Sequence, residues 1–281
     1  WEKLSANTAL PWSLGLIERF EDRWGWRGLS YNTALSLSLE LIERFQDRWD
    51  WRWLGQNTAL PWSPELIERF EDRWGREVFE SALPENTALP WSLELIERYE
   101  DRWGWDRLST NETLPLSLEL IERFEDRWDW GGGFLSSRGL SSNIALPLSP
   151  ELIERFENRW DWGRLSEKGD LPWSLELIER FEDRWEWSGP YVYRRGLSGN
   201  EALPWSLELI ERFEDRWDWE KLSANTALPW SLGLIERFED RWDWESLSVN
   251  KALSLPLLRP TDIVEIMAHQ VVDNQPPGIS V

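Results

Sequence analysis

A tandem repeat with a period of 25 residues constrains this chain more than any other feature of its sequence. The tetrapeptide Leu-Ile-Glu-Arg occurs nine times, with its isoleucine at positions 17, 42, 67, 96, 121, 153, 178, 210 and 235. Most intervals between these isoleucines are 25 residues, and the other three are 29, 32 and 32. A unit this short cannot bury an apolar face alone and must stack on its neighbours. We therefore predict one elongated solenoid of about nine repeats over residues 1–253.

The three longer intervals mark insertions, near residues 75–84, 131–139 and 188–196. All three lie at the same point of the unit, between its Trp-x-Trp pair and its Leu-Ser-x-Asn string. The repeat is lost after Leu253, and residues 254–281 predict a C-terminal cap helix that begins near Thr261 or Asp262 and is followed by a flexible tail.

The first half of each unit predicts an amphipathic helix. Ser231 is a typical N-cap, and in a sister copy Ser63 is followed by Pro64, which suits the first helical position. The spacing of the apolar residues predicts that the helix extends through Leu-Ile-Glu-Arg-Phe-Glu-Asp-Arg-Trp. One face of this helix carries the apolar residues of the unit, Leu234, Ile235, Phe238 and Trp242.

The second half of the unit allows two interpretations. Residues 218–225 fit a short helix that Asp218 caps and that Asn225 ends in the left-handed conformation. The string Leu-Ser-x-Asn followed by Leu-Pro is also similar to the strand of leucine-rich repeats, which would give an α/β solenoid. That strand needs an apolar residue where this unit has Glu220. We therefore predict an all-α solenoid of helix-turn-short-helix repeats and keep the leucine-rich-repeat-like fold as the alternative.

The whole unit, Trp-Asp-Trp-x-x-Leu-Ser-x-Asn-x-x-Leu-Pro-Trp-Ser-x-Glu-Leu-Ile-Glu-x-Phe-x-Asp-x-Trp, resembles tryptophan-rich tandem repeats of uncharacterised bacterial and large-virus proteins. The resemblance covers about 250 residues and implies no activity.

Tryptophan is the main source of apolar surface, with 25 residues against 4 tyrosines. Each buried indole removes about 150–250 Å² from water, so several tryptophans per unit compensate for its few aliphatic residues. Flat rings also stack on sugars, but the tryptophans coincide with the apolar stripe, which favours a place in the core.

The formal net charge of the chain is −21, and an acidic surface repels the phosphates of nucleic acids. We therefore predict no nucleic-acid partner. The chain has no apolar run of 18 residues, so we expect no membrane span. Because the same acidic residues recur in every copy, we also expect charge repulsion to oppose the stack.

No catalytic arrangement, cofactor motif or metal motif stands out. The single histidine, His269, has no nucleophile beside it in the pattern, and the carboxylates recur in up to nine equivalent surroundings, which argues against one differentiated pair. A series of aspartates that follow tryptophan, such as Asp218 and Asp243, is the one arrangement in which shared calcium is conceivable. We expect neither enzymatic activity nor a cofactor.

These features favour a non-enzymatic scaffold for protein–protein interaction. The alternatives are a self-assembling structural rod or surface filament, which would be a homo-polymer, and a carbohydrate-binding repeat protein. The insertions supply the candidate partner contacts, because they bring aromatic residues and arginines that break the repeat. The candidate contacts are Phe79, Phe134, Arg138, Tyr191, Tyr193, Arg194 and Arg195.

Overall fold

The computed structural model describes residues 1–131, 139–189 and 195–253. Every regular element within these ranges is helical, and none of the described residues lies in a β-strand. The all-α prediction is confirmed, and the leucine-rich-repeat-like alternative is wrong. The predicted cap helix and tail, residues 254–281, lie outside the described residues.

The chain forms two compact units, residues 1–147 and 148–281, and each is described by itself. Unit 1 contains α1 (Glu2–Ser5), α2 (Leu14–Arg19), α3 (Trp26–Tyr31), α4 (Leu39–Arg44), α5 (Trp51–Gln56), α6 (Pro64–Arg69), the π-helix η1 (Val78–Ala82), α7 (Leu93–Arg98), α8 (Trp105–Leu108), α9 (Leu118–Arg123) and the 3₁₀-helix η2 (Leu140–Ser142). Unit 2 contains α10 (Pro150–Arg155), α11 (Trp162–Glu167), α12 (Leu175–Arg180), α13 (Leu207–Arg212), α14 (Trp219–Ala224), α15 (Leu232–Arg237), α16 (Trp244–Ser248) and the 3₁₀-helix η3 (Lys251–Leu253).

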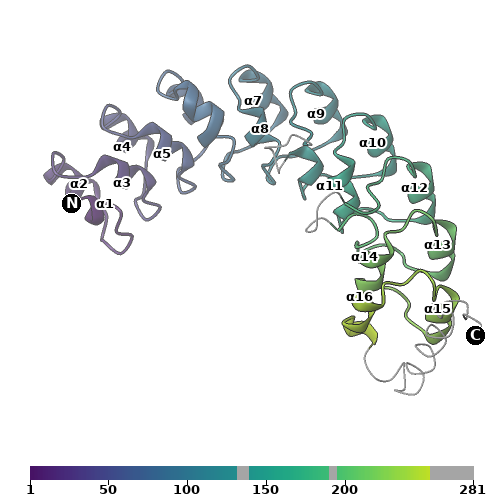
Figure 1. The fold of residues 1–281 in the computed structure, drawn as a ribbon. Helices are drawn as coiled ribbons and strands as arrows, with labels where there is room; N and C mark the ends of the chain where they lie inside the picture. The colour runs from purple at the N-terminus through teal and green to yellow at the C-terminus, as the bar shows by residue number, and fades with distance from the viewer. Residues whose placement is uncertain (132–138, 190–194, 254–281) are drawn as a thin grey trace, which may run out of the picture. The chain divides into compact units, whose positions relative to one another are not determined.

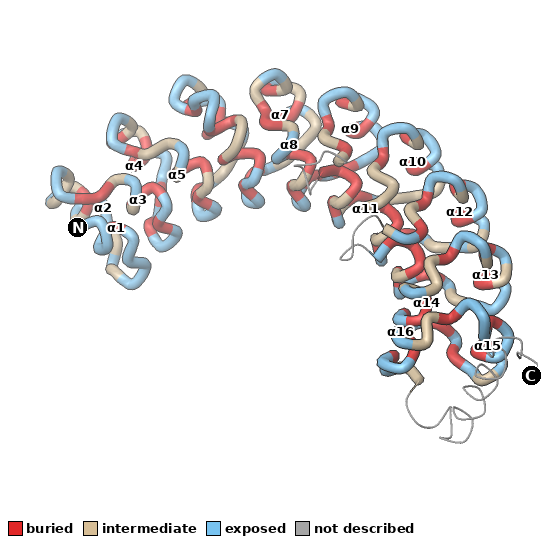
Figure 2. Tube along the Cα trace, in the orientation of Figure 1, coloured by how far each residue is buried: buried red, intermediate tan, exposed pale blue. Residues whose placement is uncertain are grey.

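Within each unit the helices form two rows (Figure 1). The first row contains the Leu-Ile-Glu-Arg helices, which are α2, α4, α6, α7 and α9 in unit 1 and α10, α12, α13 and α15 in unit 2. The second row contains the short helices that begin at the second tryptophan of the Trp-x-Trp pair, such as α3, α5, α11 and α14. Buried residues lie between the two rows, and the connecting turns are exposed (Figure 2). The core of each unit is therefore a continuous strip rather than a central cluster.

Serine begins each helix of the first row, as the sequence predicts. The Ser231 hydroxyl accepts a hydrogen bond from the Leu234 N–H at 3.2 Å, and Ser63 caps α6 in the same way ahead of Pro64. The helices are shorter than predicted, because each ends at the arginine after only six residues. The next residues form a turn that returns the tryptophan to the core. A helix of six residues is not stable alone in water, so stacking must hold it.

Aspartate begins most helices of the second row. The Asp218 carboxylate accepts from the Lys221 N–H at 3.2 Å, which confirms the predicted cap of α14. At the equivalent Asp243, hydrogen bonds from the backbone N–H and side chain of Ser246 lower the pKa of the carboxyl group. The predicted left-handed end at Asn225 is wrong, since this residue has φ −73° and ψ 120°.

The asparagine at this position instead links one repeat to the preceding one. The Asn57 side-chain amide donates to the backbone oxygens of Ser30 at 2.9 Å and Asn32 at 3.4 Å, and its oxygen accepts from the Ala59 N–H at 2.9 Å. Asn57 is fully buried. The residues that donate to the preceding repeat in this way form the asparagine ladder: Asn32, Asn57, Asn86, Asn111, Asn143, Asn200, Asn225 and Asn250.

A serine next to the ladder makes a second link, to the following repeat. The Ser223 hydroxyl donates to the Trp219 carbonyl at 2.6 Å and accepts from the Asp243 N–H at 3.0 Å. Ser5, Ser30, Ser109 and Ser166 accept from the following repeat in the same manner. Within each unit, consecutive repeats are therefore hydrogen-bonded through buried polar side chains, and the position of these side chains fixes the register of the stack.

The tryptophans pack between the rows. The ring centre of Trp219 lies 4.9 Å from that of Trp242, which it meets edge-on, and 5.2 Å from that of Phe238. The ring centres of Trp230 and Trp242 are 5.0 Å apart. The indole N–H groups of Trp242, Trp219 and Trp230 donate to the backbone oxygens of Ile235, Glu214 and Asn225 at 3.1, 3.1 and 3.0 Å. Of the 25 tryptophans, only Trp1 is largely exposed, at 42%. The core prediction for the repeat tryptophans is confirmed.

Ion pairs between consecutive first-row helices offset part of the charge repulsion expected along the stack. Arg44 contacts Glu18 at 2.8 Å, and Arg48 contacts Asp22 at 2.6 Å. Equivalent pairs recur along both units, for example between Arg212 and Glu179. Each arginine reaches back to the carboxylates of the preceding repeat, so unlike charges alternate along the row. The side chains are exposed, and each pair contributes only about 0–1 kcal/mol.

We predict that Asn57→Ala lowers the free energy of unfolding by about 2 kcal/mol or more, because it leaves buried groups of two repeats without a partner. Asn158→Ala is the matched control, since Asn158 is exposed and accepts one hydrogen bond from Arg184 at 2.6 Å. We expect this control to change stability by less than about 0.5 kcal/mol. Urea unfolding of both variants tests the prediction, and equal losses would contradict a structural role for the ladder.

We predict that Tyr99→Phe stabilises the chain by about 1 kcal/mol. Tyr99 is 4% exposed, and its hydroxyl has no hydrogen-bond partner among the described residues. The other eight copies carry phenylalanine at this position. The reverse change, Phe213→Tyr, places a hydroxyl in the same surroundings and should lower the thermal midpoint. A lower midpoint for Tyr99→Phe would show that the hydroxyl is satisfied.

Candidate functional site

Differences between the repeats gather on the second row of helices. The first-row sequence Leu-Ile-Glu-Arg is the same in all nine copies. In contrast, the position after the second tryptophan holds Arg27 in α3, Arg52 in α5 and Asp106 in α8. The next position holds Gly28, Trp53 and Arg107. Positions that carry the stack are thus constant, and the second row gives each repeat its own surface.

The most distinctive group on this row is the Arg27–Tyr31–Trp53 cluster of unit 1. Arg27 and Tyr31 lie four residues apart on one face of α3. The Arg27 guanidinium lies over the Trp53 ring, with its carbon 4.6 Å from the ring centre. The Tyr31 ring meets the Trp53 ring edge-on, with 5.4 Å between the ring centres. Trp53 is half-buried, whereas Tyr31 is 54% exposed.

Close packing of neighbouring helices positions this cluster. A Cβ atom on Gly28 would lie 3.0 Å from the Ser5 Cβ, so glycine lets α3 approach α1. A Cβ atom on Gly55 would lie 2.9 Å from a methyl carbon of Val78, which brings α5 against η1. The helices that carry Arg27, Tyr31 and Trp53 are therefore held on both sides, and the cluster is built on a rigid base.

The polar groups of the cluster are available to a ligand. Arg27 is exposed and forms no ion pair with a carboxylate in the described part of the chain. Arg52 occupies the same repeat position on α5, yet it pairs with Glu77 at 2.7 Å. Within the described ranges, the Tyr31 hydroxyl and the Trp53 indole N–H also form no hydrogen bond. The cluster thus presents a cationic donor, a hydroxyl and aromatic surface together.

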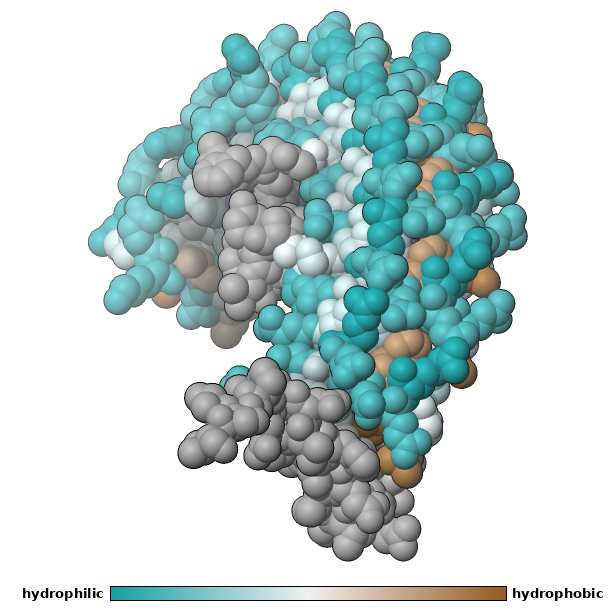
Figure 3. All heavy atoms as spheres, turned by 45° about the vertical axis from the view of Figure 1, so that its right-hand side comes forward, coloured by the Kyte–Doolittle hydropathy of each residue, from teal (hydrophilic) through white to brown (hydrophobic). Residues whose placement is uncertain are grey.

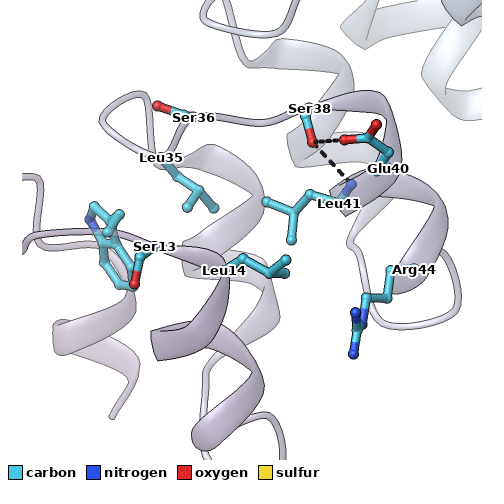
Figure 4. Close-up of a pocket in the computed structure, with 9 residues that line it drawn as sticks. Ser13, Leu14, Leu35, Ser36, Ser38, Glu40, Leu41 and Arg44 are labelled. Atoms are coloured by element: carbon cyan, nitrogen blue, oxygen red, sulfur yellow. Dashed lines mark hydrogen bonds between the residues drawn. The ribbon is translucent and has the colours of Figure 1, made fainter.

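A groove on the first row is the second candidate, between α2 and α4. It has a volume of about 300 Å³. Leu14, Leu35 and Leu41 point into it, and Ser38 and Glu40 lie at its rim (Figure 4). Leu14 is 46% exposed, and the Ser38 hydroxyl already accepts from the Leu41 N–H at 3.2 Å. The groove therefore offers apolar surface and few free polar groups.

An equivalent groove lies between α13 and α15 in unit 2. It measures about 840 Å³ and is lined by Leu207, Leu234 and Gly233, where other copies carry glutamate in place of the glycine. Figure 3 brings unit 2 forward and shows apolar atoms in small patches separated by hydrophilic side chains. The first residue of the first-row helix is largely exposed in several copies, namely Leu14, Leu39, Leu118 and Leu207.

Phe79 is not a partner contact, and this part of the prediction is wrong. The first insertion forms η1 in place of a second-row helix, and Phe79 is fully buried there. Its ring lies 5.0 Å from both Tyr99 and Trp103, and the Arg102 guanidinium lies 3.9 Å above it. Phe79 takes the place of the second-row tryptophan that other repeats pack at this point.

Backbone hydrogen bonds join the described residues on either side of the other two insertions. The Leu140 N–H donates to Asp129 and the Leu197 N–H to Glu186, in both cases to the backbone oxygen. Arg195 is exposed, its N–H donates to Glu167 at 3.0 Å, and its guanidinium lies 3.6 Å from Glu201. The remaining predicted contacts lie outside the described residues: Phe134, Arg138, Tyr191, Tyr193 and Arg194.

Several chemical features of the sequence take structural roles. The aspartates considered for calcium cap helices, and no group of three His, Cys, Asp or Glu side chains that could hold a metal occurs among the described residues. Asn111, in the sequon Asn111-Glu112-Thr113, is a buried ladder residue that donates to the Pro84 oxygen at 2.7 Å. No helix in the described ranges is long and apolar enough to cross a membrane.

In comparisons with known proteins, no family model, curated protein or solved structure matches this chain. The site must therefore be interpreted from its own geometry. The sequence analysis missed the Arg27–Tyr31–Trp53 cluster because it looked for partner contacts only in the insertions. A signal was present, since Trp53 stands outside the three repeat positions that tryptophan otherwise occupies.

Lys168 is the exception in the asparagine ladder and is largely buried, with 7% of its side chain exposed. Its ammonium group lies 3.7 Å from the Asp170 carboxylate. Burial lowers the pKa of Lys168, and the Asp170 carboxylate opposes this shift. The folded chain therefore binds fewer protons here than the unfolded chain between the lowered pKa and the usual value of about 10.4.

We predict that the stability of the wild type relative to Lys168→Asn rises with pH across that window, because the unfolded state binds more protons at this position. Urea unfolding of both chains at about pH 7 and about pH 10 measures the difference, and the titratable groups that the two chains share contribute equally to both. Parallel stability curves would show that burial does not perturb this lysine.

Proposed function

We propose that the chain is a non-enzymatic repeat scaffold that binds a protein partner through the second row of helices. The Arg27–Tyr31–Trp53 cluster carries this proposal. Arginine, tyrosine and tryptophan are the residues most enriched among those that dominate binding energy at protein interfaces. Here they contact one another on exposed helices, outside the packing that every repeat shares.

The contrast with the repeat tryptophans supports this assignment. Trp242 is buried, and its indole N–H is bonded to a backbone oxygen, so its role in the stack is complete. Trp53 has no counterpart in the other repeats and adds nothing to the ladder. A single exposed aromatic residue is ordinary, but contiguous exposed apolar surface, such as that of Tyr31 beside the half-buried Trp53, marks interaction sites.

A self-assembling rod is a second candidate, supported by the recurring exposed leucines of the first row, including Leu118 at 49% exposure. A second copy of the chain would present exposed leucines at the same spacing, so several small apolar contacts would form together. Sedimentation over a range of concentrations separates the two proposals. A carbohydrate ligand needs an exposed aromatic ring on which the sugar can stack. In the cluster this ring is Tyr31, which is 54% exposed, so binding of sugars is tested with the same variants.

We predict that the double variant Tyr31→Ala/Trp53→Ala loses partner capture and keeps its fold. The side chains lie outside the buried strip, so the melting temperature should fall by only a few degrees. Capture from an extract of the source organism, read by mass spectrometry, compares this variant with the wild type.

Leu118→Ala is the matched control, because it removes an exposed apolar side chain from the first row. If the control loses the same proteins and the cluster variant retains them, the binding surface is the first row and the proposal fails.

A further inference from the structure

We infer that the Arg27–Tyr31–Trp53 cluster binds a side-chain carboxylate that lies beside an apolar side chain on an extended segment of the partner protein. This inference rests on the proposed function and specifies the chemistry of its ligand. Three observations carry it: the unpaired state of Arg27, the stacking of its guanidinium, and the acidic surroundings of the cluster.

Arg27 differs from the arginine at the same position on α5 and from Arg44 and Arg48 of the next first-row helix. Arg44 and Arg48 pair with carboxylates of the preceding repeat, and Arg52 pairs with Glu77. Arg27 is exposed, and the described residues provide no carboxylate for it. Arg19, Arg23 and Arg164 likewise form no ion pair within the described ranges, and Arg23 also lies 4.6 Å over a tryptophan, Trp1. Arg27 is distinguished by the exposed Tyr31 ring beside its tryptophan, and its N–H groups are free.

The contact with Trp53 prepares these N–H groups for a ligand. The guanidinium carbon lies 4.6 Å from the centre of the indole ring. Stacking of this kind uses the face of the guanidinium and leaves the in-plane N–H fork directed away from the ring. A carboxylate accepts two parallel hydrogen bonds from such a fork, which a single amide oxygen or hydroxyl does not.

Tyr31 and Trp53 define what lies beside the carboxylate. The Tyr31 ring is 54% exposed and stands edge-on to Trp53, so the pair offers apolar surface with a hydroxyl at its border. The hydroxyl is a further donor to the same carboxylate. An aliphatic or aromatic side chain next to the acidic residue of the ligand covers the rings.

The charge of the chain limits the ligand to one carboxylate. Repulsion from the acidic surface acts over about 8–10 Å at physiological ionic strength and increases with each added acidic residue. A run of aspartates and glutamates is therefore rejected, whereas a single carboxylate is held by short-range hydrogen bonds. Because α1 lies beside α3 and η1 beside α5, the surface continues on both sides of the cluster. An internal segment fits this open row better than a chain end.

The experiment selects a randomised peptide library, displayed with blocked and with free C-termini, against the full chain. Peptides that bind the wild type and not Trp53→Ala should carry one Asp or Glu beside an apolar residue. A double-mutant cycle then combines Arg27→Gln with replacement of the peptide's Glu by Gln. Each single change should weaken binding about tenfold, and the second change should add little once the first is made.

Two further variants separate geometry from charge. Arg27→Lys keeps the charge and loses the fork, so binding should fall nearly as far as in Arg27→Gln. Arg107→Gln removes the same charge from α8, where Arg107 already pairs with Glu85, and should leave binding unchanged.

The outcomes distinguish this inference from the proposal beneath it. If no selected peptide depends on Trp53, the cluster is not a contact site and the proposed function fails. If peptides depend on Trp53 and Tyr31 but lack a carboxylate coupled to Arg27, the scaffold proposal stands and this inference is wrong. Dependence on a free C-terminal carboxylate, or preference for acidic runs, would also overturn it.

Discussion

The buried hydrogen bonds between consecutive repeats are the interaction on which the rest of this structure depends. Helices of six residues have no stability of their own, and the exposed ion pairs of the first row contribute little. The Asn57 amide, fully buried and bonded to two backbone oxygens of the preceding repeat, is satisfied only when the two repeats are in register. The apolar strip supplies the driving force for stacking, and the ladder determines which stacking is allowed.

This division of roles explains why tryptophan suits the unit. An indole fills a large volume, and its single N–H must find an acceptor when it is buried. In the unit that begins at Trp219, the indole N–H groups of Trp230 and Trp242 find backbone oxygens of the same unit, and that of Trp219 bonds to Glu214 at the end of the preceding one. The aromatic residues thus complete the inside of a repeat while asparagine and serine connect repeats. Side chains of the second row that do neither, such as Trp53 and Tyr31, are free to differ between copies.

The sequence predicts the local features of a repeat well and its long-range features poorly. Ser231 and Asp218 are caps within three residues of the groups they bind, and Leu234, Ile235, Phe238 and Trp242 follow helical spacing, so both can be recognised in one unit. The amide of Asn57 reaches carbonyl oxygens 25 and 27 residues earlier, and no local pattern contains that distance. The strand-like string Leu-Ser-x-Asn therefore looked like a leucine-rich repeat, although its asparagine ladder joins helical units. The same limit hid the ion pairs between copies, since Arg44 meets Glu18 of the preceding copy.

The serine next to the ladder explains why the insertions differ. At the first insertion the preceding repeat carries Gly55 and the inserted repeat itself carries Pro84 in place of this serine, and the Gly104 N–H bonds to the Phe79 oxygen instead. A Cβ atom on Gly104 would collide with the Glu80 backbone oxygen, so this glycine also accommodates η1. At the other two insertions Ser109 and Ser166 keep their bonds to the following repeat. The first insertion therefore joins the core where Gly55 and Pro84 stand in place of the serine, and the apolar character of Phe79 alone does not distinguish a core residue from a surface contact.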